Sequence, residues 1–136
     1  MAGGLAWRGK MDEELGKLQG EWNVVFLEVE GLVPAPHTYA GAKIVIDGDQ
    51  FTSIAMGATY GGKIAVDAGT DPKTFRMTFT DGPEKGKRNF GIYELDGNRW
   101  RICLTITGGA APTEFATSPR SGRALETLDR EKHAGS

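Results

Sequence analysis

Apolar and polar residues alternate along most of the chain after Gly20, with a few continuous apolar runs, and this pattern is typical of β-strands. Short turn-forming stretches separate the runs. The two shortest, at 47–48 and 96–97, are Asp-Gly pairs, which supply the positive φ that a tight hairpin requires. The pattern predicts a strand over 21–29, a hairpin over 42–56, a strand over 59–67, three strands within 73–107 and a last strand over 123–130.

A different period precedes Gly20. Within residues 10–18, Met11, Leu15 and Leu18 fall on one helical face, and acidic residues occupy the first turn, where they suit the helix dipole. We therefore predict one short helix, a single domain over 10–131, a flexible N-terminus over 1–9 and a flexible tail over 132–136.

About eight strands joined mostly by short turns favour antiparallel neighbours in a meander. The edges of such a sheet must be covered, and closure into a barrel covers them most completely. The predicted fold is an all-β, eight-stranded, up-and-down antiparallel barrel with a short N-terminal helix, and a β-sandwich is the alternative.

Composition narrows the class of protein. The 136 residues fit one domain, and 39% hydrophobic and 25% charged residues are ordinary values for a globular protein. A net charge of −2 provides no electrostatic case for binding nucleic acid or acidic membranes. A single cysteine, Cys103, excludes an intrachain disulfide and a cysteine-based metal cluster. No apolar run has the length of a signal peptide or a membrane span, so we expect a cytoplasmic protein without membrane insertion.

Four stretches resemble, in order and spacing, a small lipocalin-like bacterial domain family of unknown function, found chiefly in planctomycetes and acidobacteria. They are LQGEWNVVFLEVEG, IVIDGDQFT, FTDGPEKGKRNFGIYELDGNRWRICL and PTEFATSPRSG. The resemblance covers Leu15 to Arg130, and its most specific part is GIYELDG followed by RICL and PTEF. The chain departs from the family pattern in its Gly-rich stretch 55–66, and in Arg120, where a Gly is commoner.

The resemblance implies a lipocalin-like (calycin) barrel but no established activity. It also implies how one end of the barrel closes: the Gly-x-Trp of Gly20 and Trp22 opens the first strand, and Arg130 near the end of the last strand packs across the indole. A guanidinium on an indole face is a favourable cation–π contact. We therefore expect these three residues to be architectural.

Motifs for catalysis, metals and cofactors are mostly missing. His37 and His133 are isolated, and no His/Asp/Glu spacing makes a credible metal site. GPEKGK has a Lys at the position where a phosphate-binding loop requires its second Gly, and no Ser or Thr follows. Cys103 would be a nucleophile only if a cation such as Arg101 lowered its pKa, and a buried structural cysteine is the better interpretation. We expect no cofactor and no metal, and a non-enzymatic protein is favoured.

For two of the predicted strands, the sequence does not show which face points into the barrel. In RWRICLTIT and TFRMTFT the apolar residues share one face, and Arg101 and Arg76 lie on the other. If the apolar faces point inward, the interior is packed or greasy and both arginines are solvated. In the opposite phase the arginines would meet an acidic head group inside the barrel, with phenolic donors from tyrosines. The candidate ligand residues are Arg76, Arg101, Tyr60, Tyr93 and Cys103.

Three functions remain as hypotheses. The first is binding of a small hydrophobic or amphipathic molecule, including one with an acidic head group, where Gly57, Gly61 and Gly62 leave room for its approach. The second is a cofactor-independent enzyme, of the isomerase or cyclase type, that confines a hydrophobic metabolite. The third is an interaction or structural domain with a filled barrel that works through exposed apolar residues. Its candidates are Leu32, Val33 and Phe115.

Overall fold

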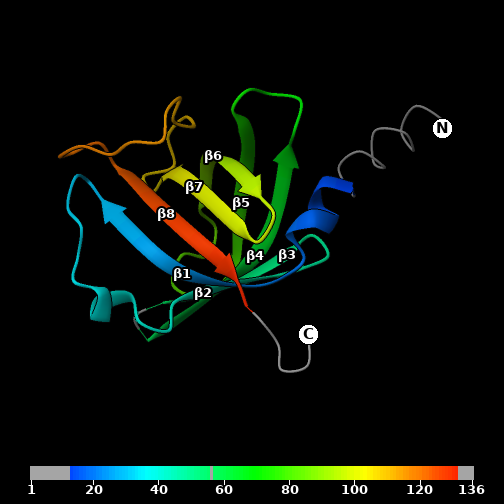
Figure 1. The fold of residues 1–136 in the computed structure, drawn as a ribbon, viewed down its shortest axis with the longest axis horizontal. Helices are drawn as coiled ribbons and strands as arrows, with labels where there is room; N and C mark the ends of the chain where they lie inside the picture. Colours follow the sequence, from blue (N-terminus) through cyan, green and yellow to red (C-terminus); the bar gives the residue numbers. More distant parts are fainter. Residues whose placement is uncertain (1–12, 56, 132–136) are drawn as a thin grey trace.

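The protein is a closed, eight-stranded antiparallel barrel, described here from a computed structural model over residues 13–55 and 57–131 (Figure 1). Each strand pairs with its neighbours in sequence, and β8 returns to pair with β1. The predicted barrel is confirmed. The strands are β1 (Gly20–Val29), β2 (Lys43–Asp47), β3 (Gln50–Ala55), β4 (Ala58–Asp67), β5 (Lys73–Asp81), β6 (Arg88–Asp96), β7 (Arg99–Thr105) and β8 (Arg123–Arg130).

The predicted Asp-Gly turns join β2 to β3 and β6 to β7. Gly48 has φ 64° and Gly97 has φ 59°, the left-handed conformation that a side chain disfavours. The Pro-rich connection between β1 and β2 contains an unpredicted element, the 3₁₀ helix η1 (Pro36–Tyr39).

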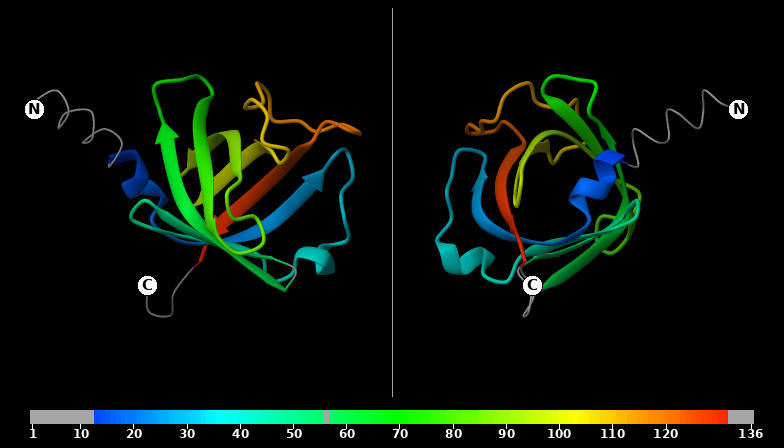
Figure 2. Two further views of the ribbon diagram at one scale, coloured as in Figure 1. Left: turned by 180° about the vertical axis from the view of Figure 1, so that it is seen from behind. Right: turned by 45° about the vertical axis from the view of Figure 1, so that its right-hand side comes forward.

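The predicted N-terminal helix is present over residues 13–18. Leu15 and Leu18 are buried in the main core beside Trp22, so this helix covers one end of the barrel (Figure 2). We call this the helix end, and the opposite end, where the longer connections 30–42, 82–87 and 106–122 emerge, the loop end. The predictions for residues 1–9 and 132–136 lie outside the described residues.

The barrel interior holds the main hydrophobic core. The apolar faces of the strands point inward. Residues that are directly paired across antiparallel strands share a face, so the pairing shows which residues are interior. Trp100, Ile102 and Leu104 of β7 oppose Leu95, Tyr93 and Gly91 of β6 across that face. Other buried core members are Ile44, Ile46, Phe51, Ile64, Val66, Phe75, Met77, Phe79, Ala124 and Leu128.

A second apolar cluster lies on the outside of the barrel, where Ile92, Cys103 and Leu125 are covered by Phe26 and by Phe115 of the 106–122 connection. That connection therefore buries part of the outer face of β6, β7 and β8. Within it, Arg120 has φ 62°, a conformation that a glycine would adopt more easily.

Strand pairing leaves a seam between β1 and β2. β2 pairs only with Gly20 to Asn23, and a bulge between Val24 and Phe26 turns the rest of β1 toward β8 alone. The segment carrying η1 runs outside the sheet between the end of β1 and the start of β2 (Figure 1). Tyr39 of η1 is buried, so this segment covers the seam.

The glycines of the Gly-rich stretch serve the backbone rather than a ligand. A Cβ at Gly62 would lie 1.9 Å from the Thr78 carbonyl oxygen and 2.9 Å from a ring carbon of Phe51. Gly57 occupies a turn at φ 81°, and Gly61 belongs with Gly62 to a bulge between β4 and β5. The space expected at Gly62 for a ligand is therefore filled by a neighbouring strand.

Candidate functional site

The two arginines considered for an interior site lie on the outside of the barrel. Arg76 is paired with Phe90 and Ala65, whose faces oppose the core, and it is exposed. Arg101 donates to Glu94 Oε1 at 3.1 Å, and its guanidinium lies 4.8 Å from the ring centroid of Phe115. Both arginines therefore point away from the barrel interior and cannot contact a ligand there.

Cys103 is also on the outer face, fully buried beneath the 106–122 connection, with its sulfur 3.7 Å from the Ala116 carbonyl oxygen. Burial raises the pKa of the Cys103 thiol, although that carbonyl contact and the nearby charges of Arg123 and Arg101 oppose the rise. Because the thiolate is the reactive form, this environment is that of an inert cysteine.

Gly20, Trp22 and Arg130 meet at the helix end. The Arg130 guanidinium lies 4.2 Å from the Trp22 ring centroid, and it donates to the carbonyl oxygens of Lys17 (2.7 Å) and Gln19. Trp22 in turn donates to the Leu18 carbonyl oxygen at 2.8 Å. Arg130 thereby contacts both the indole of Trp22 and the end of the helix. The indole N–H of Trp22 is buried and already bonded, so it is not accessible to a ligand.

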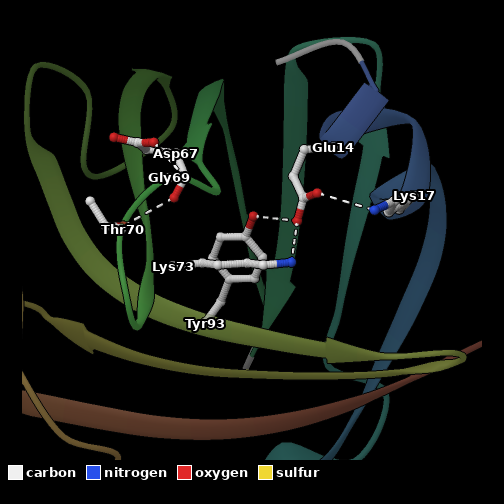
Figure 3. A network of polar contacts seen from close by, with 7 residues as sticks. All are labelled: Glu14, Lys17, Asp67, Gly69, Thr70, Lys73 and Tyr93. Atoms are coloured by element: carbon white, nitrogen blue, oxygen red, sulfur yellow. Dashed lines mark hydrogen bonds and ion pairs between the residues drawn. The ribbon is translucent and has the colours of Figure 1, made fainter. Parts of the chain in front are cut away.

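Tyr93 is inside the barrel but is engaged by the helix. Its hydroxyl donates to Glu14 Oε1 at 2.8 Å, and the Lys73 ammonium reaches the same oxygen at 3.0 Å (Figure 3). Lys17 pairs with the other oxygen of that carboxylate at 3.4 Å. Burial and the adjacent Glu14 carboxylate raise the pKa of Tyr93. These contacts fasten the helix to β5 and β6.

Glu14 is 5% exposed, and burial alone would raise its pKa. The hydrogen bonds from Lys73 and Tyr93 and the positive charges of Lys73 and Lys17 outweigh burial, so the pKa of Glu14 lies below its ordinary value. A lowered carboxyl pKa contributes stability above the unfolded-state pKa, and this contribution is lost as pH falls through the folded-state pKa.

We expect Glu14→Gln to lower the free energy of unfolding at neutral pH by about 1–3 kcal/mol, because Lys73 loses its buried partner. The loss should shrink as pH falls below the ordinary carboxyl pKa, measured by urea denaturation. The exposed neighbour Glu13→Gln is the matched control and should change little. Equal effects of the two variants would contradict the fastening role of Glu14.

Some interior positions near the loop end are partly accessible, although Phe79, Leu104 and Ala124 at that end are buried. Val29, Ala58 and Tyr60 face inward by register and are partly accessible, whereas Trp22 and Trp100 at the other end are fully buried. Tyr60 packs its ring edge-on against Phe79, with centroids 6.2 Å apart. The interior is therefore sealed at the helix end and partly accessible toward the loops.

A cavity of about 40 Å³ lies at the seam between β1 and β2, and several inward-facing residues line it. We call it the seam cavity. Its polar side chains are Glu126 of β8, Ser53 of β3, Tyr39 of η1 and, at the edge, Lys43 of β2. Its apolar lining consists of Val24, Leu27, Ala42, Ile44, Ile54 and Ala55.

Glu126 is an acidic residue on the inward face of β8. It is paired with Leu27 and Ile102, so its side chain points into the barrel among apolar neighbours. The surrounding protein desolvates the carboxyl and raises the pKa of Glu126 to about 7. No hydrogen bond or ion pair joins it to another described residue, while its remaining accessible surface faces the seam cavity.

The sequence pattern did not single out Glu126. In RALETLDR it alternates with Ala124 and Leu128, which share its face, but Leu125 on the other face is also buried. With both faces partly apolar, alternation does not show which one is the interior. The sequence held only a weak indication that Glu126 faces inward: it lies at period two between a small residue, Ala124, and an apolar one, Leu128.

A broader, open depression of about 990 Å³ lies between the helix, the β4–β5 connection and the outer face of β5. Arg76 lines it together with Thr74, Phe90 and Ala111, and is available there to a molecule on the outside of the barrel. Of the charged groups at its edge, Glu14 and Lys17 are paired with each other.

Two of the surface residues considered for protein interaction are exposed: Leu32 (75%) and Val33 (56%). Phe115 instead packs against the outer cluster. Across the described ranges 13–55 and 57–131, no three His, Cys, Asp or Glu side chains are grouped so as to hold a metal ion, and no helix is long and apolar enough to cross a membrane. No family model, curated protein or solved structure matches this chain.

Proposed function

We propose that the protein binds a small, largely apolar molecule inside the barrel and holds the polar group of that molecule in the seam cavity. The observation that carries this proposal is the Glu126 carboxyl, which faces a cavity without a partner among the described residues. An ionisable group in such a place costs free energy of folding, because burial without compensation disfavours its charged form. Groups kept in this state are concentrated at functional sites.

The shape of the interior supports the same function. The apolar walls of the seam cavity suit a hydrocarbon, and its volume of about 40 Å³ suits a polar head group or a few waters. The partly accessible inward positions Val29, Ala58 and Tyr60 extend toward the loop end, where the remainder of a ligand would lie. The interior of an eight-stranded barrel is wide enough either to be filled by side chains or to hold one small ligand, and a ligand here would lie beside the core side chains.

The test uses 1-hexanol as a neutral probe, titrated into the isotope-labelled protein and followed by backbone amide chemical shifts. We expect saturable shifts at Glu126, Leu27 and Ser53, and none at outward residues such as Arg76. Ser53→Leu, which fills the cavity, should weaken binding about tenfold or more. Thr52→Leu, the outward neighbour on β3, is the matched control and should bind as the wild type does. Shifts confined to the outer face, or no saturation, would overturn the proposal.

A proton-transfer enzyme is the second function, and the pKa of about 7 for Glu126 favours it. A carboxyl poised near neutral pH can take a proton from one carbon of a bound substrate and return it to another, as an isomerisation requires. Copurified apolar molecules that incorporate deuterium from heavy water with the wild type, but not with Glu126→Gln, would separate catalysis from binding. Absence of incorporation would leave binding as the function.

A further inference from the structure

Several polar side chains that line the seam cavity form no hydrogen bond with another described residue. Glu126, Ser53 and Tyr39 all line it, and no hydrogen bond joins any of the three side chains to another described residue. A carboxylate is acceptor-only, and each hydroxyl oxygen accepts as well as donates. A ligand group that contacts the ionised Glu126 carboxylate must therefore supply a donor, and the two hydroxyls can accept further donors from it. A primary ammonium group, with three N–H donors and no acceptor, has that composition.

The charge of the seam cavity favours a cation. On the elements packed around Glu126, Leu27 of β1 and Ile102 of β7 are apolar, and Tyr39 of η1 contributes a hydroxyl. Lys43 of β2 is the other charged residue that lines the cavity, and no ion pair joins it to Glu126. The carboxylate thus lacks a counter-ion within residues 13–55 and 57–131.

The volume agrees with the same group. About 40 Å³ accommodates an ammonium with its first methylene, or a few waters, so the rest of an alkyl chain would extend beyond the cavity. A carboxylate or phosphate ligand would meet the Glu126 carboxyl with the same sign of charge, which is unfavourable for both.

We propose that the ligand is an alkyl amine, bound as its ammonium to Glu126 in the seam cavity. This inference rests on the proposed function and names its ligand class. Binding couples to protonation: below neutral pH the carboxyl holds a proton, which it must release to solvent as the ammonium enters. Affinity for the amine therefore rises as the carboxyl ionises, while affinity for an uncharged alcohol depends little on pH.

The experiment compares n-hexylammonium, 1-hexanol and hexanoate by titration calorimetry with the whole chain. At pH about 8, where Glu126 is ionised, hexylammonium should bind at least about tenfold more tightly than hexanol, and hexanoate should bind least. At pH about 6 the amine affinity should fall about tenfold, because roughly a tenth of the carboxyl is ionised there. Heats in two buffers of different ionisation enthalpy should show close to one proton released per amine at the lower pH.

Glu126→Gln decides where the selectivity comes from. In this variant hexylammonium should lose its advantage and its pH dependence, while hexanol binding is retained. If hexanol and hexylammonium bind the wild type equally, or if Glu126→Gln keeps the preference for the amine, the ammonium site is refuted and the proposed function survives. If none of the three probes binds, the proposed function itself is refuted.

Discussion

Replacing Glu126 by Gln is expected to raise the free energy of unfolding at pH about 8 by about 3 kcal/mol. The pKa of this carboxyl is raised by burial from an ordinary 4.5 to about 7. Between these two values the folded state binds a proton that the unfolded state has lost. Stability of the wild type therefore falls as pH rises through this window, by about 1.4 kcal/mol per pH unit, and is constant above it as far as this group is concerned.

Glutamine has the shape of the protonated acid but does not ionise, so the variant should lack this decline. Near pH 4 the two proteins should be about equally stable, and the difference should develop between pH about 4.5 and 7. Urea denaturation followed by tryptophan fluorescence measures it, since Trp22 and Trp100 are both buried.

The matched control is Asp129→Asn, a carboxyl-to-amide change on the same strand. Asp129 is partly exposed and pairs with Arg99, whose hydrogen bonds lower the pKa of Asp129. A change in this pair should be small and of the opposite sign. A Glu126→Gln variant that is less stable than the wild type at pH about 8 would show that the carboxylate is compensated in the protein, and would remove the basis for a ligand there.

The second large effect is expected from one methyl group at Gly62. An alanine Cβ there would approach the Thr78 carbonyl oxygen to 1.9 Å, and this neighbour is backbone, so relief requires a shift of β5. We expect Gly62→Ala to cost about 3 kcal/mol or to prevent folding, at the upper end of overpacking effects. The urea midpoint and the slope of the transition provide the measurement.

Gly61→Ala is the matched control. Its Cβ would lie 3.5 Å from the Asp81 Cβ, an ordinary contact, and its backbone needs no positive φ. It should be neutral within about 1 kcal/mol, with the loss of backbone freedom in the unfolded chain acting in its favour. If the two variants are equally stable, the bulge between β4 and β5 does not bring the strands together as described.

Most of the fold could be predicted from local sequence. All eight strands and the N-terminal helix were predictable, because hydrophobic period and turn chemistry are properties of neighbouring residues. The Asp-Gly pair at 96–97, for example, requires no knowledge of the rest of the chain. Barrel closure followed as the way to pair every edge of a long meander.

The site depended on contacts between residues distant in sequence. Arg76 and Arg101 alternate with apolar residues, and both phases of their strands were open until closure of the sheet placed the larger apolar sets inside. Glu126 was not predictable, because an acidic residue in a strand usually faces solvent. Here the solvent side of β8 is covered by Phe115, which reverses that expectation.

By itself the sequence determined the strands, their turns and the antiparallel order. The contact between Trp22 and Arg130 was implied by the family resemblance, and the structure contains it. Only the tertiary structure decided which face of each strand is interior, and hence that the interior holds a carboxyl and not two guanidinium groups. The physical reason is that a period of two separates the faces of a strand but assigns neither to the core. That assignment comes from register around the closed sheet and from the 106–122 connection that covers its outside.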